Sequence, residues 1–316
     1  MGNETHNGTN EMIRYFGYAC MNLSLQTPKS PRIYTSRTLR MNRFTLERAG
    51  ELAVQNSADL ITILEWNLKN DIRFFRVGSD LFPFMDHPDL GYSLDDLQPE
   101  HKTKIVENLA TAGKYAKSNG MRLSCHPGPY TCLASPKSEI VTKSIKSLEM
   151  HSLLADLLGY GEEFAINIHI GGVYDNKVET AKRFVDAYKS LPQMTQRRLT
   201  VENDDKASMW SMWDLWELIY QRCGVKLVLD IHHHKFCGAN NSIETAARWA
   251  FATWSGFPEI PKIHYSESRD NKHPQAHSDF IKCQIPILCP HTQYDVMIEA
   301  KSKDLALLDY RKQIQK

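Results

Sequence analysis

Short runs rich in branched and aromatic residues recur along the chain, and each precedes a longer polar segment whose apolar residues return at intervals of three and four. The short runs predict buried β-strands, and the longer segments predict amphipathic helices that pack on them. The eight predicted strands begin at Ile13, Arg73, Met121, Phe164, Arg197, Val225, Pro261 and Tyr294. The predicted helices include residues 44–70, 100–120 and 137–161, and Gly120 and Gly161 are expected to end the last two.

This alternation of strands and helices predicts the α/β class and a parallel sheet that is covered on both faces. Eight such units favour a single closed (β/α)8 TIM barrel over an open doubly wound sheet. No glycine-rich dinucleotide loop follows the first strand, which also disfavours the open sheet. We expect residues 1–12 to be a flexible polar leader and residues 13–316 to form the barrel, because no composition shift marks a second domain.

The composition limits the partners and the compartment. The formal net charge is +1, so any attraction to nucleic acid must come from a local patch. Seven cysteines without a C-x-x-C pair indicate a reduced intracellular protein and argue against a thiolate zinc site. The leader lacks the apolar stretch of a secretory signal, and no run approaches the roughly 20 apolar residues of a membrane span. We therefore expect an intracellular protein of the cytoplasm or nucleus that is not secreted.

Side chains that can bind metal ions stand at the carboxyl ends of the predicted strands, where barrels of this class carry their catalytic residues. They are His126, His169, Glu202, Asp230, His232, His233, His234, Lys262, His264 and Glu299, with His87 in the loop after the second strand and His277 in the loop after the seventh. A single histidine at a strand end is more often a structural residue, but many imidazoles and carboxylates at one barrel mouth need a compensating cation. Histidine and carboxylate ligands without a thiolate suit Mn, Zn or Fe and do not select among them.

The stretch LVLDIHHHK allows two arrangements around Asp230. Strict strand alternation would point Asp230, His232 and His234 the same way, whereas a turn after Ile231 brings Asp230 next to His233. The strand must end near this point to reach the barrel rim. We therefore favour Asp230 with His233, and we expect the other two histidines to be supporting or loop residues.

Two further features bear on nucleic acid. The long loop after the first strand, residues 27–43, contains no acidic residue. Its basic residues are Lys29, Arg32, Arg37, Arg40 and Arg43. This loop is either a solvated loop or a set of phosphate contacts beside the metal mouth. Tyr18, Tyr130 and Tyr174 stand at exposed-looking loop starts and could stack on bases, although core packing is the commoner fate of a tyrosine.

The chain carries, in order, the motifs FGYACMNLSL, TSRTLR, RVGSDLFPFMDHP, LSCHPGPY, IHIGG, VENDD, LDIHHH, PKIHYSES followed by HPQAH, and VMIEAK. From about Tyr15 to Lys301, these motifs resemble the UV damage endonuclease family. The resemblance implies a metal-dependent (β/α)8 barrel that acts on UV-damaged double-stranded DNA. It implies cutting immediately 5′ of cyclobutane pyrimidine dimers and 6-4 photoproducts, with a 3′-hydroxyl and a 5′-phosphate as products. We also expect a monomer without an organic cofactor or a membrane partner.

Carried over residue by residue, the resemblance implies a cluster of two or three ions, with manganese favoured and zinc or magnesium as alternatives. The implied ligands are His126, His169, Glu202, Asp230, His233, His264, His277 and Glu299, with His87 close by. Lys262 matches a lysine that can be carboxylated and then act as a ligand. Tyr18 and Asn22 match positions that face the lesion, and Tyr130 matches an aromatic residue that wedges into the duplex.

The expected mechanism is hydrolysis by a metal-activated hydroxide. Glu202 would bridge a metal pair that lowers the pKa of a water, and the hydroxide would attack the phosphorus in line. Another cation near His233, Lys262 and His277 would stabilise the leaving 3′-oxygen. Arg37 and Arg40 are the expected phosphate contacts of the basic loop.

One residue departs from the family pattern. The family usually has HPGQY where this chain has HPGPY, so Pro129 replaces a glutamine beside Tyr130. The change leaves the metal residues intact and bears on lesion recognition. The alternatives are an apurinic-site endonuclease, a metal-dependent sugar isomerase of similar barrel, and a non-catalytic damage-binding protein. An isomerase would leave the arginine-rich loop and HPGPY unexplained.

Overall fold

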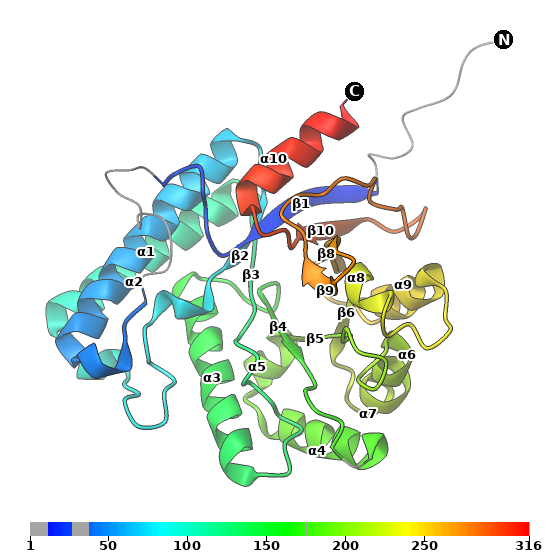
Figure 1. Cartoon of the computed structure of the whole chain (residues 1–316). Helices are drawn as coiled ribbons and strands as arrows, with labels where there is room; N and C mark the ends of the chain where they lie inside the picture. Colours follow the sequence, from blue (N-terminus) through cyan, green and yellow to red (C-terminus); the bar gives the residue numbers. More distant parts are fainter. Residues whose placement is uncertain (1–11, 27–37, 175, 316) are drawn as a thin grey trace.

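The computed structural model describes residues 12–26, 38–174 and 176–315, and eight parallel strands of this part of the chain close into a barrel (Figure 1). The strands are β1 (Ile13–Ala19), β2 (Phe74–Val77), β3 (Arg122–Cys125), β4 (Ala165–His169), β5 (Leu199–Glu202), β6 (Lys226–Asp230), β7 (Lys262–Tyr265) and β10 (Tyr294–Ile298). β1 pairs with β2 on one side and with β10 on the other, which closes the sheet. The predicted TIM barrel is therefore confirmed, and an open sheet is excluded.

Helices surround the barrel, and α1 and α2 lie along one another on its outside (Figure 1). The α-helices are α1 (Leu46–Lys69), α2 (Pro99–Ser118), α3 (Ser138–Leu157), α4 (Lys177–Ser190), α5 (Gln193–Arg198), α6 (Met212–Asp214), α7 (Gln221–Cys223), α8 (Ile231–His234), α9 (Ile243–Ala252) and α10 (Lys303–Ile314). A π-helical segment, Leu215–Tyr220, joins α6 to α7, and short 3-10 turns occupy Met41–Arg43, Ser79–Leu81 and Leu94–Asp96. No helix in the described ranges is long and apolar enough to cross a membrane.

The helix boundaries follow from local chemistry. Thr45 caps α1 by accepting a hydrogen bond from the backbone N–H of Arg48, and a proline occupies the first turn of α2. Gly120 follows α2 with φ of +62°, as the sequence predicts. The prediction for α3 is wrong by two residues: Gly159, with φ of +69°, takes the left-handed position instead of Gly161.

An ionic cluster closes the amino end of the barrel. Asp295, near the start of β10, accepts hydrogen bonds from Arg122 at 2.7 Å and from Arg14 at 2.6 and 3.1 Å. Arg122 is the first residue of β3 and is also buried, with its guanidinium over the ring of Trp254. Residues at this end of a (β/α)8 barrel serve stability, so the opposite end is left for chemistry.

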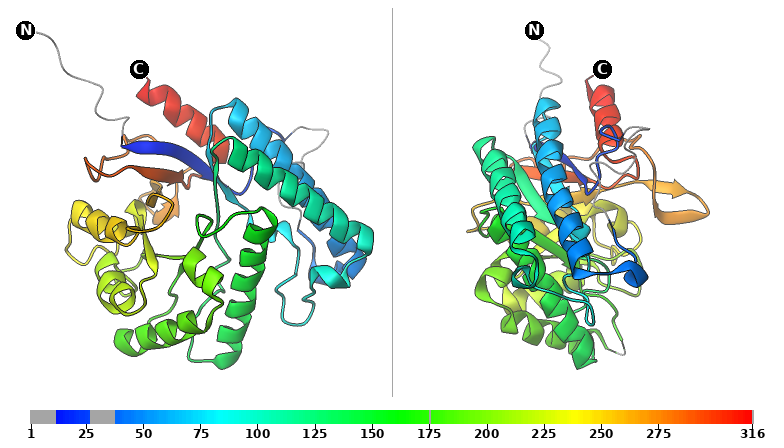
Figure 2. Two further views of the ribbon diagram at one scale, coloured as in Figure 1. Left: turned by 180° about the vertical axis from the view of Figure 1, so that it is seen from behind. Right: turned by 90° about the vertical axis from the view of Figure 1, so that its left-hand side faces the viewer.

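A hairpin interrupts the connection between the last two barrel strands. Its strands are β8 (Ser268–Asp270) and β9 (His273–His277), and it projects from the barrel in the right-hand view of Figure 2. Only the strands that begin at Pro261 and Tyr294 were predicted in this part of the chain, because residues 268–273 show no apolar alternation.

Candidate metal centre

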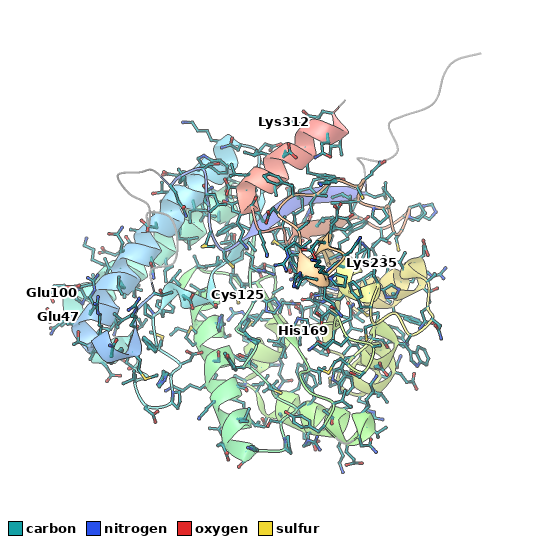
Figure 3. All side chains as sticks on the ribbon, viewed as in Figure 1. Glu47, Glu100, Cys125, His169, Lys235 and Lys312 are labelled. Carbon is teal, nitrogen blue, oxygen red and sulfur yellow. The ribbon has the colours of Figure 1, made fainter. Side chains whose placement is uncertain are left out.

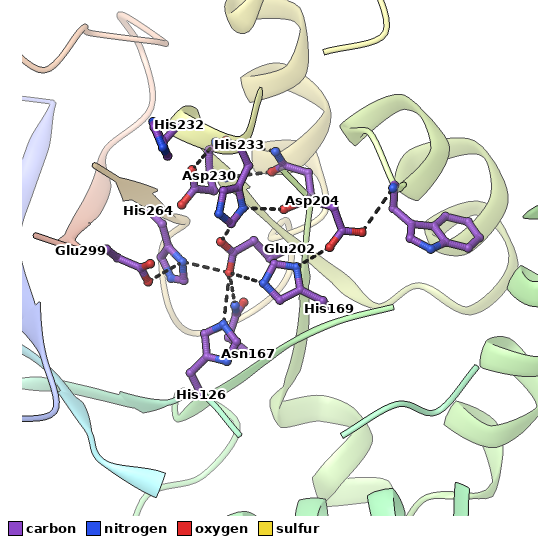
Figure 4. Close-up of polar contacts among 12 residues, drawn as sticks. His126, Asn167, His169, Glu202, Asp204, Asp230, His232, His233, His264 and Glu299 are labelled. Atoms are coloured by element: carbon purple, nitrogen blue, oxygen red, sulfur yellow. Dashed lines mark hydrogen bonds and ion pairs between the residues drawn. The ribbon is translucent and has the colours of Figure 1, made fainter. Parts of the chain in front are cut away.

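The carboxyl ends of β3 to β7 and β10 bring histidines and carboxylates together at one end of the barrel (Figure 4). β4 ends at His169, β5 at Glu202 and β6 at Asp230. Three groups of side chains could each hold a metal ion, with ligand atoms within 4.8 Å of one another. They are His126, His169 and Glu202; Glu202, Asp230 and His233; and Asp230, His264 and Glu299. Neighbouring groups share a carboxylate, so the geometry suits a cluster of cations.

Glu202 lies at the middle of this arrangement and is 1% exposed. Its Oε2 lies 3.0 Å from His264 Nδ1, 3.5 Å from His126 Nε2 and 3.9 Å from His169 Nε2. Asn167 also donates a hydrogen bond to this oxygen, at 2.5 Å. Burial alone would raise the pKa of Glu202, but the facing imidazoles of His264 and His169 hold it well below its usual range. Glu202 is thus a carboxylate anion that belongs to two of the three groups.

Four of the predicted metal-binding histidines have an oxygen within 3.0 Å of Nδ1. The Nδ1 of His126 lies 3.0 Å from the carbonyl of Pro127, and the Nδ1 of His277 lies 2.7 Å from that of Glu299. His233 Nδ1 is 2.9 Å from a backbone carbonyl and His169 Nδ1 is 2.9 Å from a carboxylate. A carbonyl only accepts, so each of the three Nδ1 atoms beside a carbonyl carries a hydrogen, and Nε2 is the ring nitrogen left for a cation. Such outer hydrogen bonds are typical of metal-binding histidines.

Asp230 has a buried oxygen that needs a partner. Its Oδ1 accepts from the backbone N–H of His233 at 2.7 Å, whereas its Oδ2 has no hydrogen-bond partner. Burial raises the pKa of Asp230 to about 6. A cation beside Oδ2 would remove this cost, since metal coordination compensates a buried carboxylate. The donors are nitrogen and oxygen without sulfur, and this set fits a divalent ion such as Mn, Zn or Fe.

Lys262 lies under this cluster and is fully buried. Its Nζ is 3.0 Å from His264 Nε2, so His264 turns its other nitrogen toward the carboxylates. Burial, and then the neighbouring Arg122, lower the pKa of Lys262 to about 7. The amine is therefore partly neutral near neutral pH, which lysines at the protein surface are not.

The HHH stretch follows the turn arrangement that the sequence analysis favoured, and strict alternation is wrong. Asp230 caps α8, which begins at the next residue, and its side chain meets the backbone of His233. The rings of His232 and His234 instead reach the carbonyls of Gln275, at 3.1 Å, and of Asn241, at 3.0 Å. Neither residue belongs to any of the three groups.

The loop after β3 carries the most exposed aromatic residue among those described. Tyr130 is 91% exposed. The loop beneath it is fixed, because Arg183 donates to the carbonyl of Ala134 at 3.0 Å and the backbone N–H of Cys132 donates to Ser144 at 2.8 Å. Beside Tyr130 is a cavity of about 540 Å³ whose lining includes Leu39, Phe84, His87, Pro88, Ile140 and Lys143. Pro129 is exposed next to Tyr130.

Several predicted site residues lie elsewhere. His87 belongs to none of the three groups, and its Nδ1 accepts from the backbone N–H groups of Asp89 and Leu90, both at 3.1 Å. The expectation that Tyr18 is exposed is wrong. Tyr18 and Asn22 are both 0% exposed and hydrogen-bond to one another at 2.9 Å, so they support the first loop from within.

Two of the remaining predicted contacts lie among the described residues, and one lies outside them. Arg37 lies outside the described residues, and Arg40 is exposed just before the first 3-10 turn. Tyr174 is 45% exposed, with the guanidinium of Arg183 at 5.4 Å from its ring centre. In the view with all side chains, His169 lies near the centre of the molecule, whereas Glu47 lies at its edge (Figure 3).

Four residues that hold the centre in place were not predicted from the sequence. Asn203 bonds both the N–H and the C=O of Asp230, at 2.8 and 3.1 Å, and Asp204 orients the imidazole of His169. Asn167 bonds Glu202, and the buried Arg76 forms an ion pair with Glu299. A usable signal was a lone charged or amide residue inside an otherwise apolar strand, as in FFRV and AINIH.

Comparisons with known proteins agree with this geometry. Residues 14–316 match a family model described as "UV-endonuclease UvdE". A UV-damage endonuclease of Schizosaccharomyces pombe is 36% identical over 93% of this chain and 49% of its own length. A UV DNA damage endonuclease of Bacillus cereus strain Q1 is 30% identical over 95% of this chain and 94% of its own length. The solved structure titled "Crystal Structure of SacUVDE" has a TM-score of 0.82 and 29% identity, and it covers 95% of this chain and 98% of that one. The chain therefore spans about half the length of the fission yeast relative and nearly all of the bacterial one.

Proposed function

Because the chain belongs to the UV-endonuclease UvdE family, we propose that it is a DNA repair endonuclease acting on UV-damaged double-stranded DNA. It hydrolyses the phosphodiester bond immediately 5′ of cyclobutane pyrimidine dimers and 6-4 photoproducts and leaves a 3′-hydroxyl and a 5′-phosphate. The observation that carries this proposal is the buried carboxylate of Glu202, shared by two potential ligand groups at the barrel mouth. We further propose that it works as an intracellular monomer without an organic cofactor.

Two or three divalent cations would be held by the three groups, with His277 completing the site from the hairpin. Manganese is the favoured ion on the family resemblance, and zinc and magnesium are the alternatives. When bound, such ions polarise the phosphoryl oxygen and lower the pKa of a coordinated water to about 7. The chain itself holds these ligands in one arrangement. Hydrogen bonds from histidine Nδ1 atoms to backbone carbonyls fix the imidazole rings without any ion.

The protonation of the metal-free centre couples metal binding to pH. Although burial alone would lower them, the facing carboxylates raise the pKa values of both His169 and His233 to about 9. Both rings are thus protonated at neutral pH and must lose a proton before Nε2 can bind a cation. Metal binding at neutral pH therefore releases protons.

Lys262 has two candidate roles in this centre. Its partly neutral amine can add to carbon dioxide, with loss of one proton to solvent, and the resulting carbamate is an anionic ligand. Unmodified, its ammonium is a cation near the leaving 3′-oxygen. The buried position beside His264 is compatible with either role, and a mass measurement distinguishes them.

Lesion recognition is assigned to the exposed loop after β3. Tyr130 stacks in the gap left by the unstacked photoproduct, a contact of about 1–3 kcal/mol per base. Pro129 offers no side-chain hydrogen bond to the opposing bases, so discrimination depends on how easily the damaged duplex deforms. Replacing Pro129 by glutamine should therefore change the preference between lesion types more than the cutting rate at saturation. Arg40, with Arg37 beyond the described residues, supplies phosphate contacts.

The proposal is tested with three duplexes of one sequence that carry a single photoproduct, a single abasic site or no damage. We expect cutting of the photoproduct duplex in excess over the intact one. Preference for the abasic duplex would instead identify an apurinic-site endonuclease. Tight binding of the photoproduct without any cutting, at every metal tried, would identify a damage-binding protein. Inertness toward all three duplexes would favour the sugar isomerase.

A further inference from the structure

The hairpin of β8 and β9 is joined to the barrel by few polar contacts. Within the described chain, two hydrogen bonds link residues 268–277 to other elements. His277 Nδ1 donates to the carbonyl of Glu299 at 2.7 Å, and His232 Nε2 lies 3.1 Å from the carbonyl of Gln275. A two-stranded hairpin is marginally stable by itself in water, so these contacts help to hold it in place. At its base, the backbone N–H of Ser278 donates to Glu267 at 2.8 Å, and the carbonyl of Ser278 accepts from Lys301 at 3.0 Å.

The surroundings of His232 fix its ring in position for the hydrogen bond to Gln275. Its side chain is 0% exposed, and its ring meets Phe236 at 5.3 Å and His277 at 5.6 Å, with interplanar angles of 82° and 85°. Because the carbonyl of Gln275 only accepts, His232 Nε2 must carry the hydrogen. The ring is therefore fixed by packing on both sides and uses its one donor on the hairpin backbone.

His277 is the one predicted ligand that the hairpin carries, and it belongs to none of the three groups. Its imidazole stands against the rings of both His232 and His233, at 5.6 and 6.2 Å. The other potential ligands stand on the barrel strands or directly after them, so their positions do not depend on the hairpin. A shift of β9 would move His277 and leave the other groups in place.

We propose that His232 is a positioning residue that docks the hairpin on α8 and so holds His277 at the metal centre. The inference rests on the proposed metal centre and adds to it a role for a histidine that is not a ligand. It predicts that loss of the His232 hydrogen bond weakens the binding of a cation next to His277. Binding of a cation at His126, His169 and Glu202 should be unchanged. Loss of such an outer contact typically weakens metal binding by about 10- to 100-fold.

The chain offers a matched control in His234. This residue is on the same short helix, is 8% exposed and makes the same kind of bond, from Nε2 to the carbonyl of Asn241 at 3.0 Å. Its partner lies in a different loop. His234→Phe therefore reproduces the loss of a buried imidazole donor without touching the hairpin.

The test combines Mn²⁺ titration calorimetry of chelator-treated protein with hydrogen exchange of the metal-free protein. His232→Phe keeps a ring against Phe236 and should weaken one class of Mn²⁺ sites by about 10- to 100-fold. It should also speed amide exchange in residues 273–277. His234→Phe should match the wild type in both measurements, and His232→Gln, whose amide can donate to the same carbonyl, should recover most of the loss.

Unchanged Mn²⁺ binding and unchanged hairpin exchange in His232→Phe would overturn the inference. If the wild type binds no Mn²⁺ at all, the proposed metal centre fails, and the exchange measurement still tests the docking role. If His232→Phe does not fold, hydrogen exchange of the metal-free wild-type protein provides the test. The docking role predicts slow amide exchange in residues 273–277, and rapid exchange there would contradict it.

Discussion

Replacing Glu202 by glutamine removes one charge and no volume from the centre. The carboxylate lies 3.9 Å from His169 Nε2, and at this separation an ion pair contributes about 4 kcal/mol at an effective dielectric constant of 20. This energy corresponds to about three pKa units. The pKa of His169, about 9 in the parent, should therefore fall toward its ordinary value of 6.5 or lower.

The same change removes the carboxylate that two potential ligand groups share. Mutations of outer contacts cost metal sites about 10- to 100-fold, so loss of this shared ligand should reduce nicking by more than about a hundredfold. Asn167 can still donate to the oxygen of the new amide, so the fold should be retained. His169→Ala should likewise abolish nicking and stay soluble, since it removes a ligand and no core packing group.

Two assays check this prediction. An NMR titration of the metal-free protein reports the pKa of His169 in the parent and in Glu202→Gln, and a plasmid assay reports nicking. Glu259→Gln is the control, because Glu259 pairs with Arg14 at the opposite end of the barrel. A His169 pKa that stays near 9, together with nicking within tenfold of the parent, would refute the assignment of Glu202.

The remaining predictions concern pH, modification and DNA contact. Metal binding must displace protons from His169 and His233, whose pKa values are about 9. The apparent affinity for Mn²⁺ should therefore rise between pH 6.5 and 8, by roughly tenfold per pH unit for each proton released. An affinity that does not change with pH in calorimetry would contradict this. If Lys262 is carboxylated, intact mass at mildly alkaline pH should show an added carboxyl group that Lys262→Ala lacks, and that variant should lose activity; ordinary mass with full activity in the variant excludes the modification. Tyr130→Ala should weaken binding to damaged DNA more than about tenfold, in line with loss of a 1–3 kcal/mol stack, and parent-like binding and cutting would disprove the wedge role. Arg40→Ala should weaken binding to damaged and intact duplexes alike and reduce the salt dependence of binding. A loss of binding confined to damaged DNA would instead place Arg40 at the lesion.

The sequence predicted the barrel because each buried strand carries its own signal. Near-continuous apolar runs such as KLVLD and AINIH need no knowledge of distant residues to be recognised as strands. The same strand ends predicted His169, Glu202 and Asp230, since in a closed parallel barrel all carboxyl ends meet at one mouth.

Other features depend on contacts that periodicity cannot show. Tyr18 looked exposed at the end of its strand but is enclosed, because Asn67 of α1 accepts its hydroxyl hydrogen at 2.6 Å. Asn203 is next to Glu202 in the sequence, yet its task is to bond the backbone of Asp230 on the neighbouring strand. The hairpin strands are short and exposed, so hydrophobic pattern gives no sign of them.

The most direct test is the position and metal dependence of the cut. A 5′-labelled duplex with one defined photoproduct is incubated with the protein and Mn²⁺, and in parallel with protein stripped by a chelator. We predict a single product that ends immediately 5′ of the photoproduct with a 3′-hydroxyl that a polymerase can extend, and no product without metal. Cutting at another position, or equal cutting by the metal-free protein, would contradict it.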